Sequence, residues 1–445
     1  MRLRPLSSVR HSQRGVATLV VALLMLFVVS LGALYVNRGV MAEQRASGNQ
    51  MQATLTQEVA EAGIEWATGM LNAPYDIGPD CKFSNAFGNE SFRKRYAFTE
   101  WDAATPSTDV KPAAIYPGCK INPTSGALTC QCPTVDGTVA DAGAAEQPGF
   151  SVAFEPVPDP DDATKTIADA VKVTSWACTA QSGKCGWNNY TEAEGHARVS
   201  VILKLGLAPR APAAPLTCGT SCDVKGSFNI VNKDVATNGI LINAGTTIAV
   251  AGSTTMESLE GQPVNNAKIA DDPSLLALSS SDPTCDKSAM FKAYFSMTIE
   301  RFRDSPTTKV LSCGSASDCK NKLDTAYNEG WRSFYFETDL QLSGNNTYGS
   351  QADPIILVTP NAIKINGNNV FYGLIFSNSA DWNDIGTGSA TIHGAQVTCA
   401  AYNTNGNGTL NYDPDALKNA RRMSAPMARV PGSWRDFILD SDAKK

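Results

Sequence analysis

The sequence predicts an α+β protein with a long N-terminal transmembrane helix packed on an antiparallel sheet. A β-rich C-terminal domain with a helical insertion is expected to follow. Three features carry this prediction: an uncharged apolar segment near the N-terminus, alternating apolar residues between positions 149 and 205, and a repeated glycine–asparagine turn pattern beyond residue 340. The 445 residues, 43% of them hydrophobic, correspond to two or three domains with a sizeable core.

The charge pattern and the missing motifs argue against several functional classes. The net charge is −6, although the first fifteen residues contain four arginines and no acid, so the body is acidic and has no basic stripe for nucleic acid. Three histidines leave little room for a histidine-based metal site or catalytic triad. Nucleophile-elbow, zinc-protease, phosphate-loop and dinucleotide-binding motifs are missing. We therefore predict no enzyme, no catalytic residue, no cofactor and no metal.

The twelve cysteines indicate an oxidising compartment, because all of them follow the apolar segment and their number is even. Cys130 and Cys132 resemble half of a zinc ribbon, but two properly spaced knuckles are missing. Three pairs are close enough in sequence to be local disulfides: Cys178/Cys185, Cys218/Cys222 and Cys313/Cys319.

The first helix is predicted from the 21 uncharged residues Val16 to Val36, which are long enough to cross a bilayer. The arginines that precede them place the N-terminus in the cytoplasm. The helix is expected to continue beyond the membrane to Asn72, because apolar residues recur at spacings of three and four. The predicted stripe consists of Met51, Leu55, Val59, Ala62, Trp66 and Met70.

This N-terminal region resembles a known family. The run from Gln13 to Leu19, followed by the apolar segment, is similar to the class III leader and first helix of type IV pilins. The runs from Glu43 to Gln50 and from Val59 to Gly63 resemble, more narrowly, the PilX-type minor pilins. The resemblance implies that residues 1–15 are a leader and residues 16–72 the transmembrane and pilin helix.

The same resemblance implies roles for single residues. Prepilin peptidase would cleave after Gly15 and methylate the amino group of Val16. Apart from the resemblance, the apolar spacing predicts that Met51, Leu55, Val59 and Trp66 pack the helix, together with Val20 of the apolar segment. Major pilins have a glutamate where this chain has Val20. A buried carboxylate needs a partner, such as the terminal ammonium of a neighbouring subunit, so its absence fits an initiating or tip-proximal subunit.

The rest of the chain is divided by composition. Residues 73–205 are expected to form a pilin-like globular domain, and the proline- and alanine-rich residues 206–217 a linker. Residues 218–420 are expected to form the β-rich domain, with its helical insertion near 257–335, and residues 421–445 a tail. The segment from Leu340 to Asn346 is echoed by the segment from Ile363 to Asn369. Such repeats suggest stacked solenoid-like rungs, and a plain meander is the alternative.

The first functional hypothesis is a PilX-like minor pilin that helps to initiate type IV pilus assembly. It would sit at or near the pilus tip and support adhesin display, adhesion and twitching motility. The implied partners are other minor pilins and the major pilin, prepilin peptidase, the inner-membrane assembly platform and a PilY-type tip adhesin. The protein would span the inner membrane once with a periplasmic body, then reach the pilus and cell surface. The alternatives are a GspK-like pseudopilin of a type II secretion system and a membrane-anchored surface module that binds glycans.

Overall fold

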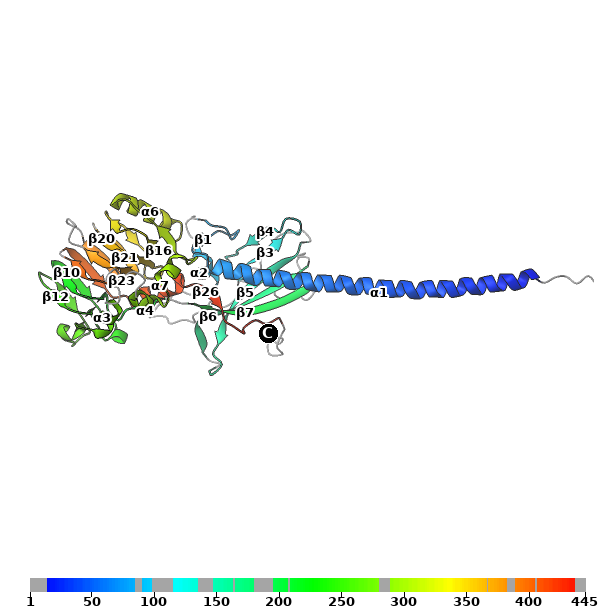
Figure 1. Ribbon diagram of the computed structural model, residues 1–445, viewed down its shortest axis with the longest axis horizontal. Helices are drawn as coiled ribbons and strands as arrows, with labels where there is room; N and C mark the ends of the chain where they lie inside the picture. The colour runs from blue at the N-terminus through cyan, green and yellow to red at the C-terminus, as the bar shows by residue number, and fades with distance from the viewer. Residues whose placement is uncertain are drawn as a thin grey trace, which may run out of the picture.

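The computed structural model describes residues 14–84, 90–97, 115–134, 147–162, 165–179, 195–206, 209–279, 289–365, 367–381, 389–404 and 406–436. The helix α1 (Arg14–Leu71) is a single rod of 58 residues, about 87 Å long at 1.5 Å per residue. Its first half projects alone from one end of the molecule, and its second half lies along the body (Figure 1).

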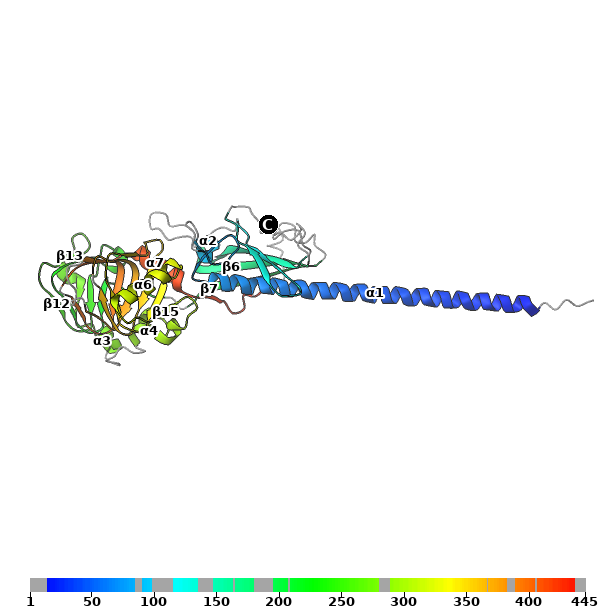
Figure 2. The ribbon, with the colours of Figure 1, turned by 90° about the horizontal axis from the view of Figure 1, so that it is seen from above.

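An antiparallel sheet covers the C-terminal half of α1. Its strands follow the order β26-β7-β6-β5-β3-β4. Their bounds are β3 (Gly118–Ile121), β4 (Leu128–Gln131), β5 (Gly149–Pro158), β6 (Thr166–Cys178), β7 (His196–Leu205) and β26 (Met427–Arg429). Side chains alternate along these strands: Phe150, Val152 and Phe154 of β5 join the core beneath α1. Figure 2, in which the molecule is turned by 90°, shows α1 running along this sheet.

A short hairpin and a helix complete this part of the molecule. The strand β1 (Asp76–Ile77) pairs antiparallel with β2 (Glu90–Ser91), and α2 (Phe92–Tyr96) follows directly. The Ser91 side chain caps α2 by accepting from the backbone N–H of Lys94.

The C-terminal domain is a solenoid of two parallel sheets. Every pairing recorded among its described strands is parallel, which excludes the meander for those strands. The larger sheet follows the order β13-β10-β25-β23-β21-β19-β16-β15, and the other follows β12-β9-β24-β22-β20-β17. The predicted repeat stacks in register, since Leu340 of β17 (Leu340–Leu342) faces Ile363 of β20 (Ala362–Ile365).

The remaining solenoid strands are short. They are β8 (Leu216–Cys218), β9 (Cys222–Val224), β10 (Ser227–Val231), β11 (Ile242–Ala244), β12 (Ile248–Val250), β13 (Thr255–Glu257), β14 (Lys268–Ile269), β15 (Lys309–Leu311), β16 (Ser333–Phe336), β18 (Thr347–Tyr348), β19 (Ile355–Val358), β21 (Val370–Ser377), β22 (Ser379–Asp381), β23 (Ser389–Thr398), β24 (Tyr402–Thr404) and β25 (Asn407–Asn411). Short helical segments lie between them or cover them: η2 (Val235–Thr237), η3 (Val264–Ala267), α3 (Pro273–Ser279), α4 (Ala289–Phe295), α5 (Ile299–Arg303), α6 (Ala316–Asn328) and α7 (Pro414–Ser424).

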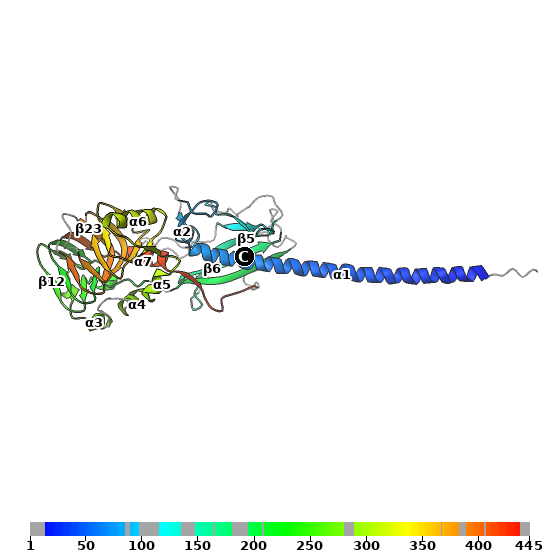
Figure 3. The same cartoon turned by 45° about the horizontal axis from the view of Figure 1, so that its top comes forward.

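The rungs of the solenoid are not stacked in chain order. The first rung, β8-β9-β10, pairs on one side with the next rung and on the other side with the last one, β23-β24-β25. The helical insertion therefore carries the chain from one end of the solenoid to the other, and the later rungs wind back to meet the first. Figure 3 shows β12 at the end far from α1, with β23 between it and α6.

The helical insertion packs through a row of aromatic side chains. The rings of Phe291 and Phe295 stack at 4.2 Å and pack against Phe376 of β21, and the buried Phe302 ring packs against both of them. This outer core lies beneath α4, α5 and α7, whereas a second core fills the inside of the solenoid. Each parallel strand is thus buried on both faces where helices cover it.

Two segments differ from their predicted roles. The predicted linker, residues 206–217, already contains the start of β8, because Leu216 is buried in the solenoid and the Pro215 carbonyl accepts from the backbone N–H of Gln396. The predicted tail, residues 421–445, begins with the end of α7 and then forms β26, which pairs antiparallel with β7. Met427 of β26 is buried in the core beneath α1, so its apolar side chain holds this segment on the first sheet.

Candidate functional site

The projecting half of α1 is the most unusual surface of the molecule. Its large apolar side chains are exposed in a continuous run from Leu19 to Val36, with Val20 49% exposed and Tyr35 82% exposed. An 18-residue window of this helix has a mean hydropathy of 2.8 and is not buried by any part of the body. Apolar surface of this extent is stable only in a bilayer or against other apolar helices.

The C-terminal half of α1 packs on the sheet through a face that overlaps the predicted stripe only in part, at Val59, Trp66 and Met70. Met51 is 73% exposed and Leu55 lies at the surface, whereas Val59 is buried as predicted. Trp66 is half-buried, and its ring lies 5.4 Å from that of Phe92. The residues that face the sheet are Thr56, Val59, Ala60, Gly63, Ile64, Ala67 and Leu71.

Small residues explain why this face of α1 packs on the sheet. A Cβ atom at Gly63 would lie 2.2 Å from the Ser175 hydroxyl and 3.0 Å from the Phe150 ring. The sheet therefore approaches the helix backbone most closely at Gly63, with alanines one turn away on both sides. The packed face keeps Val59 and Met70 of the predicted stripe and adds the small residues Ala60, Gly63 and Ala67.

The N-terminal signals predicted for processing lie at the start of α1. The helix begins at Arg14, so Gly15 and Val16 belong to its first turn, and residues 1–13 of the predicted leader lie outside the described part. Val20 follows one turn later, on the exposed apolar segment.

Arg93 joins the end of α1 to the C-terminal segment. Its guanidinium donates through Nε to the Leu71 carbonyl at 2.8 Å, and through Nη1 to the carbonyls of Arg422 and Ala425, both at 2.7 Å. Burial lowers the pKa of Arg93 to about 10, which leaves it protonated at neutral pH. The charge is thus shared among helix-terminal carbonyls that have no partner within their helices.

Further contacts fix the same segment. The Asn72 side-chain amide pairs with the backbone of Met427 as a neighbouring strand would. Its Nδ2 donates to the Met427 carbonyl, and its Oδ1 accepts from the Met427 N–H. Arg422 is buried and pairs with Asp169 at 3.4 Å, and Arg429 pairs with Glu65 on α1. The end of the chain therefore ties the solenoid back to the helix and the first sheet.

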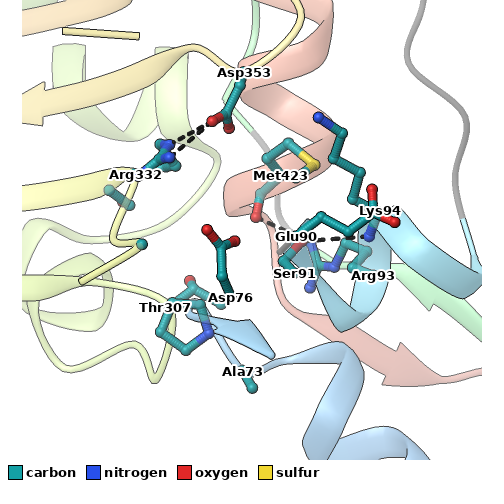
Figure 4. A pocket seen from close by; sticks show the side chains of 13 residues that line it. Ala73, Asp76, Glu90, Ser91, Arg93, Lys94, Thr307, Arg332, Asp353 and Met423 are labelled. Atoms are coloured by element: carbon teal, nitrogen blue, oxygen red, sulfur yellow. Dashed lines mark hydrogen bonds and ion pairs between the residues drawn. The ribbon is translucent and has the colours of Figure 1, made fainter. Parts of the chain in front are cut away.

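A polar pocket lies where the two domains meet (Figure 4). Asp76, Glu90 and Lys94 line it from the first domain, and Arg332 and Asp353 line it from the solenoid. Arg332 and Asp353 form an ion pair at 2.8 Å. Burial raises the pKa of Asp76 above its ordinary value, although Arg332 opposes this shift. A Cβ atom at position 330 would lie 2.9 Å from the Asp76 backbone nitrogen, and the φ of +94° at Gly330 also favours glycine there.

The disulfides in the structure include pairs that the sequence spacing did not single out. The predicted pairs Cys218–Cys222 and Cys313–Cys319 are bonded. For the third predicted pair, Cys178 forms a disulfide, and Cys185 lies outside the described residues. Two further disulfides, Cys81–Cys132 and Cys119–Cys130, lie within the first domain. The second of these links paired strands β3 and β4, and no local spacing rule favours it over its neighbours.

His393 lies in a β-strand and makes contacts of a structural kind. The His393 ring stacks on Tyr372 at 4.4 Å, its Nδ1 lies 3.2 Å from the Asn411 amide nitrogen, and burial lowers its pKa. Among the described residues, no three histidine, cysteine or acidic side chains are grouped closely enough to hold a metal ion. No local pattern points to Arg93, Asp76 or Arg332, because their partners are distant in the chain.

Comparison with known proteins connects the first helix to a family. Residues 14–65 match the family model described as PilX N-terminal, which confirms the resemblance over this helix. No curated protein matches the chain. A solved structure that it resembles, the competence-associated pilin ComZ from Thermus thermophilus, is 11% identical over 70% of this chain and 89% of the other. The TM-score of 0.17 is too low to carry an argument, so the type IV pilin-like character rests on the helix.

Proposed function

We propose that this protein is a PilX-type minor pilin that helps to start a type IV pilus and remains at or near its tip. It would be inserted in the inner membrane with a periplasmic body, cleaved after Gly15 and methylated on Val16. It would then assemble with other minor pilins, the major pilin and the inner-membrane platform, and support a PilY-type adhesin in adhesion and twitching motility.

The exposed apolar half of α1 is the observation that carries this proposal. In the bilayer, this segment would hold the subunit, because its backbone bonds are satisfied within the helix and its side chains are apolar. After extraction, the same surface would pack against other pilin helices, which replace the lipid as apolar neighbours. One surface would thus serve both states.

Two features support a tip position over a repeating one. Val20 has no charge to pair with the terminal ammonium of a neighbouring subunit. The solenoid extends the body beyond the end of α1, away from the apolar segment (Figure 1), and adds bulk that a repeating shaft would have to accommodate in every subunit. A terminal subunit avoids both requirements.

The N-terminal peptide mass of the protein, recovered from membranes and from sheared surface fibres, tests the proposal. We expect a peptide that begins at Val16 with one added methyl group. An intact leader would make the protein a plain membrane anchor, and a start beyond about residue 33 would make it an ordinary secreted protein. A Gly15→Ala variant that keeps full function would favour the surface binding module instead.

A deletion strain separates the pilus from type II secretion. The parallel strands of the C-terminal domain favour the pilus, because the corresponding insertion in GspK-like pseudopilins is mostly helical. We expect loss of twitching with normal protein secretion. Normal twitching with lost secretion would contradict the proposal.

A further inference from the structure

The outer face of the larger solenoid sheet is covered along only part of its strands. Toward the ends of β21 and β23 it is buried beneath α4, α5 and α7, as at Leu374 and Val397. Toward the beginnings of the same strands every second side chain is half-buried or exposed, and β25, β10 and β13 continue this pattern. The polar face consists of the outward side chains of residues 370–373, 389–393, 407–411, 227–231 and 255–257.

One column of the polar face consists of hydroxyl and amide side chains. The parallel register stacks Thr391, Thr409, Asn229 and Thr255 in this order, at the usual strand spacing of about 4.8 Å. The Thr255 hydroxyl donates to the Asn229 Oδ1 at 2.9 Å, which fixes the orientation of the Asn229 amide. Among the described residues, no hydrogen bond to the Thr391 or Thr409 hydroxyl is found. This column therefore offers a ligand a row of groups that donate and accept.

A second column lies beside the first and contains aromatic side chains. Tyr372, His393 and Asn411 occupy facing positions on β21, β23 and β25. The rings of Tyr372 and His393 stack at 4.4 Å, and the His393 Nδ1 lies 3.2 Å from the Asn411 amide nitrogen. Because the ring faces contact each other along the column, a ligand would meet the ring edges. These neighbours hold the side chains in place, so little rotational freedom remains to be lost when a ligand binds.

The polar face is almost without charge. Glu257, at its β13 edge, is the one acidic or basic residue in its five segments, and it pairs with Lys233 at 2.9 Å. Burial lowers the pKa of His393, which keeps this ring neutral at pH 7. Asp413, just beyond β25, is buried as the N-cap of α7.

This composition is unusual for a surface that only meets water. The outward positions of the smaller sheet include charged residues, such as Asp223 of β9 and Lys364 of β20. Solvated surfaces usually mix charges of both signs, whereas depletion of charge, with tyrosine, serine and asparagine, is typical of binding surfaces. The missing charge is thus a second indication of a ligand, separate from the stacking of the side chains.

We propose that the polar face binds a neutral polysaccharide that lies across the strands, along the two columns. Sugar hydroxyls donate and accept as the threonine and asparagine groups do, and a repeating chain suits groups that repeat from strand to strand. The face has no lysine or arginine to pair with an anionic polymer. Its aliphatic outward side chains, Val370 and Val231, are smaller than the anchors on which protein interfaces depend.

The proposal rests on the solenoid and is independent of pilus assembly. The solenoid lies beyond the end of α1, away from the apolar segment (Figure 1), so a membrane around that segment would not cover the polar face. A normal N-terminal methylated peptide would neither support nor contradict polysaccharide binding.

Native gel electrophoresis of the full chain tests the proposal, in a polyoxyethylene detergent that has no sugar head group. Each gel contains one dissolved polysaccharide: dextran, galactomannan, glucomannan or hydroxyethylcellulose as neutral chains, and alginate as an acidic one. We expect at least one neutral polysaccharide to slow the migration of the chain and alginate to leave it unchanged. Added salt should not weaken the binding, because no ion pair contributes to it.

The double variant Thr391→Val/Thr409→Val removes two hydroxyls at nearly constant shape. It should bind the same polysaccharide at least about tenfold more weakly, whereas Thr391→Ser/Thr409→Ser should keep the binding. The matched control is Thr129→Val, at an exposed threonine in β4 of the first sheet, which should bind as the wild-type chain does.

Three results would overturn the proposal. These are unchanged migration in all four neutral polysaccharides, equal slowing by alginate, and unchanged binding by Thr391→Val/Thr409→Val. The first two use the wild-type chain alone, so they remain decisive if the valine variant folds poorly.

Discussion

Arg93 shows how one buried charge can connect distant segments. Its carbonyl partners lie at the ends of α1 and α7, which are more than 300 residues apart in the chain. Such carbonyls have no partner within their own helices, and the negative end of each helix dipole favours a cation there. The residue is therefore expected to stabilise the docking of the chain end as well as the fold.

Replacing Arg93 by methionine should lower the free energy of unfolding by about 3 kcal/mol, because several buried carbonyls lose their donor. Denaturant unfolding of the detergent-solubilised chain measures the change. Arg421→Met is the control: the Arg421 side chain is 50% exposed and pairs with Asp169 at the surface, so we expect about 0.5 kcal/mol or less. Equal effects of the two substitutions would contradict the assigned role of Arg93.

Gly63 and Gly69 lie on the same helix but in opposite surroundings. Gly63→Leu should destabilise the protein by about 3 kcal/mol, because the new side chain would meet Ser175 and Phe150. Gly69→Leu should stabilise it by up to about 1 kcal/mol through helix propensity, since no atom lies within 4 Å of a Cβ there. Thermal unfolding of both variants checks the opposite signs, and a stable Gly63→Leu protein would show that the helix and sheet are not closely packed there.

Among the elements, β26 is a strand added at one edge of the first sheet. The strand pairs with β7 at the edge of the sheet, and Arg435 beyond it bridges to Ser200. Its outward residues are exposed, and its inward residue Met427 reaches the core. The chain therefore passes between the domains twice. The first passage is the segment that enters β8, and the second is the segment that leads from α7 to β26.

Met427→Lys should detach β26, because an unpaired ammonium would be buried in the core, at a cost of about 3 kcal/mol. Limited proteolysis should then cleave the chain near residue 427 much faster than in the wild-type protein. Ala428→Lys is the matched control, since this neighbour faces solvent in the same strand. Rapid cleavage of the control as well would show that β26 does not depend on its buried side chain.

The solenoid rungs are aligned by asparagines at their corners. Asn345 accepts from the backbone N–H of Asn368, and Asn368 accepts from that of Ser389, so each corner is bonded to the next. The repeated glycine–asparagine turns are the sequence trace of this ladder. Glycines complete the stack: a Cβ at Gly394 would lie 1.9 Å from the Gly373 carbonyl oxygen.

For the whole molecule, the junction of the two domains is expected to respond to pH. Burial raises the pKa of Asp76, so the folded chain holds this proton more tightly than the unfolded chain does. The resulting stabilisation is present below the ordinary carboxyl pKa of about 4 and is lost as the pH rises through the raised value.

Asp76→Asn should therefore unfold at a higher temperature than the wild-type chain at pH 7, and at the same temperature near pH 3. Thermal unfolding between these limits measures the difference. Asp80→Asn should show no such pH-dependent gain, because its carboxylate is exposed. A constant difference between Asp76→Asn and the wild type at every pH would contradict the assignment.

The division of the molecule into an exposed helix and a two-domain body fits the proposed role. The apolar segment needs a bilayer or other helices, whereas the body is held together by its own cores and by the returning chain end. A subunit of this kind can leave the membrane without unfolding its body. The apolar segment, which passes from the lipid to other helices, contributes to neither core.

The elements whose signals are local can be predicted from the amino-acid sequence. The length and hydropathy of the first helix, the alternation in β5, β6 and β7, the phenylalanine stripe of the insertion and the solenoid repeat all follow from neighbouring residues. The packed face of α1, the order of the rungs, the return of β26 and the pocket at the junction emerge only in the folded chain. These depend on close approach at Gly63 and on partners such as Arg93 and Ala425, which hundreds of residues separate, and no pattern of neighbouring residues encodes such contacts.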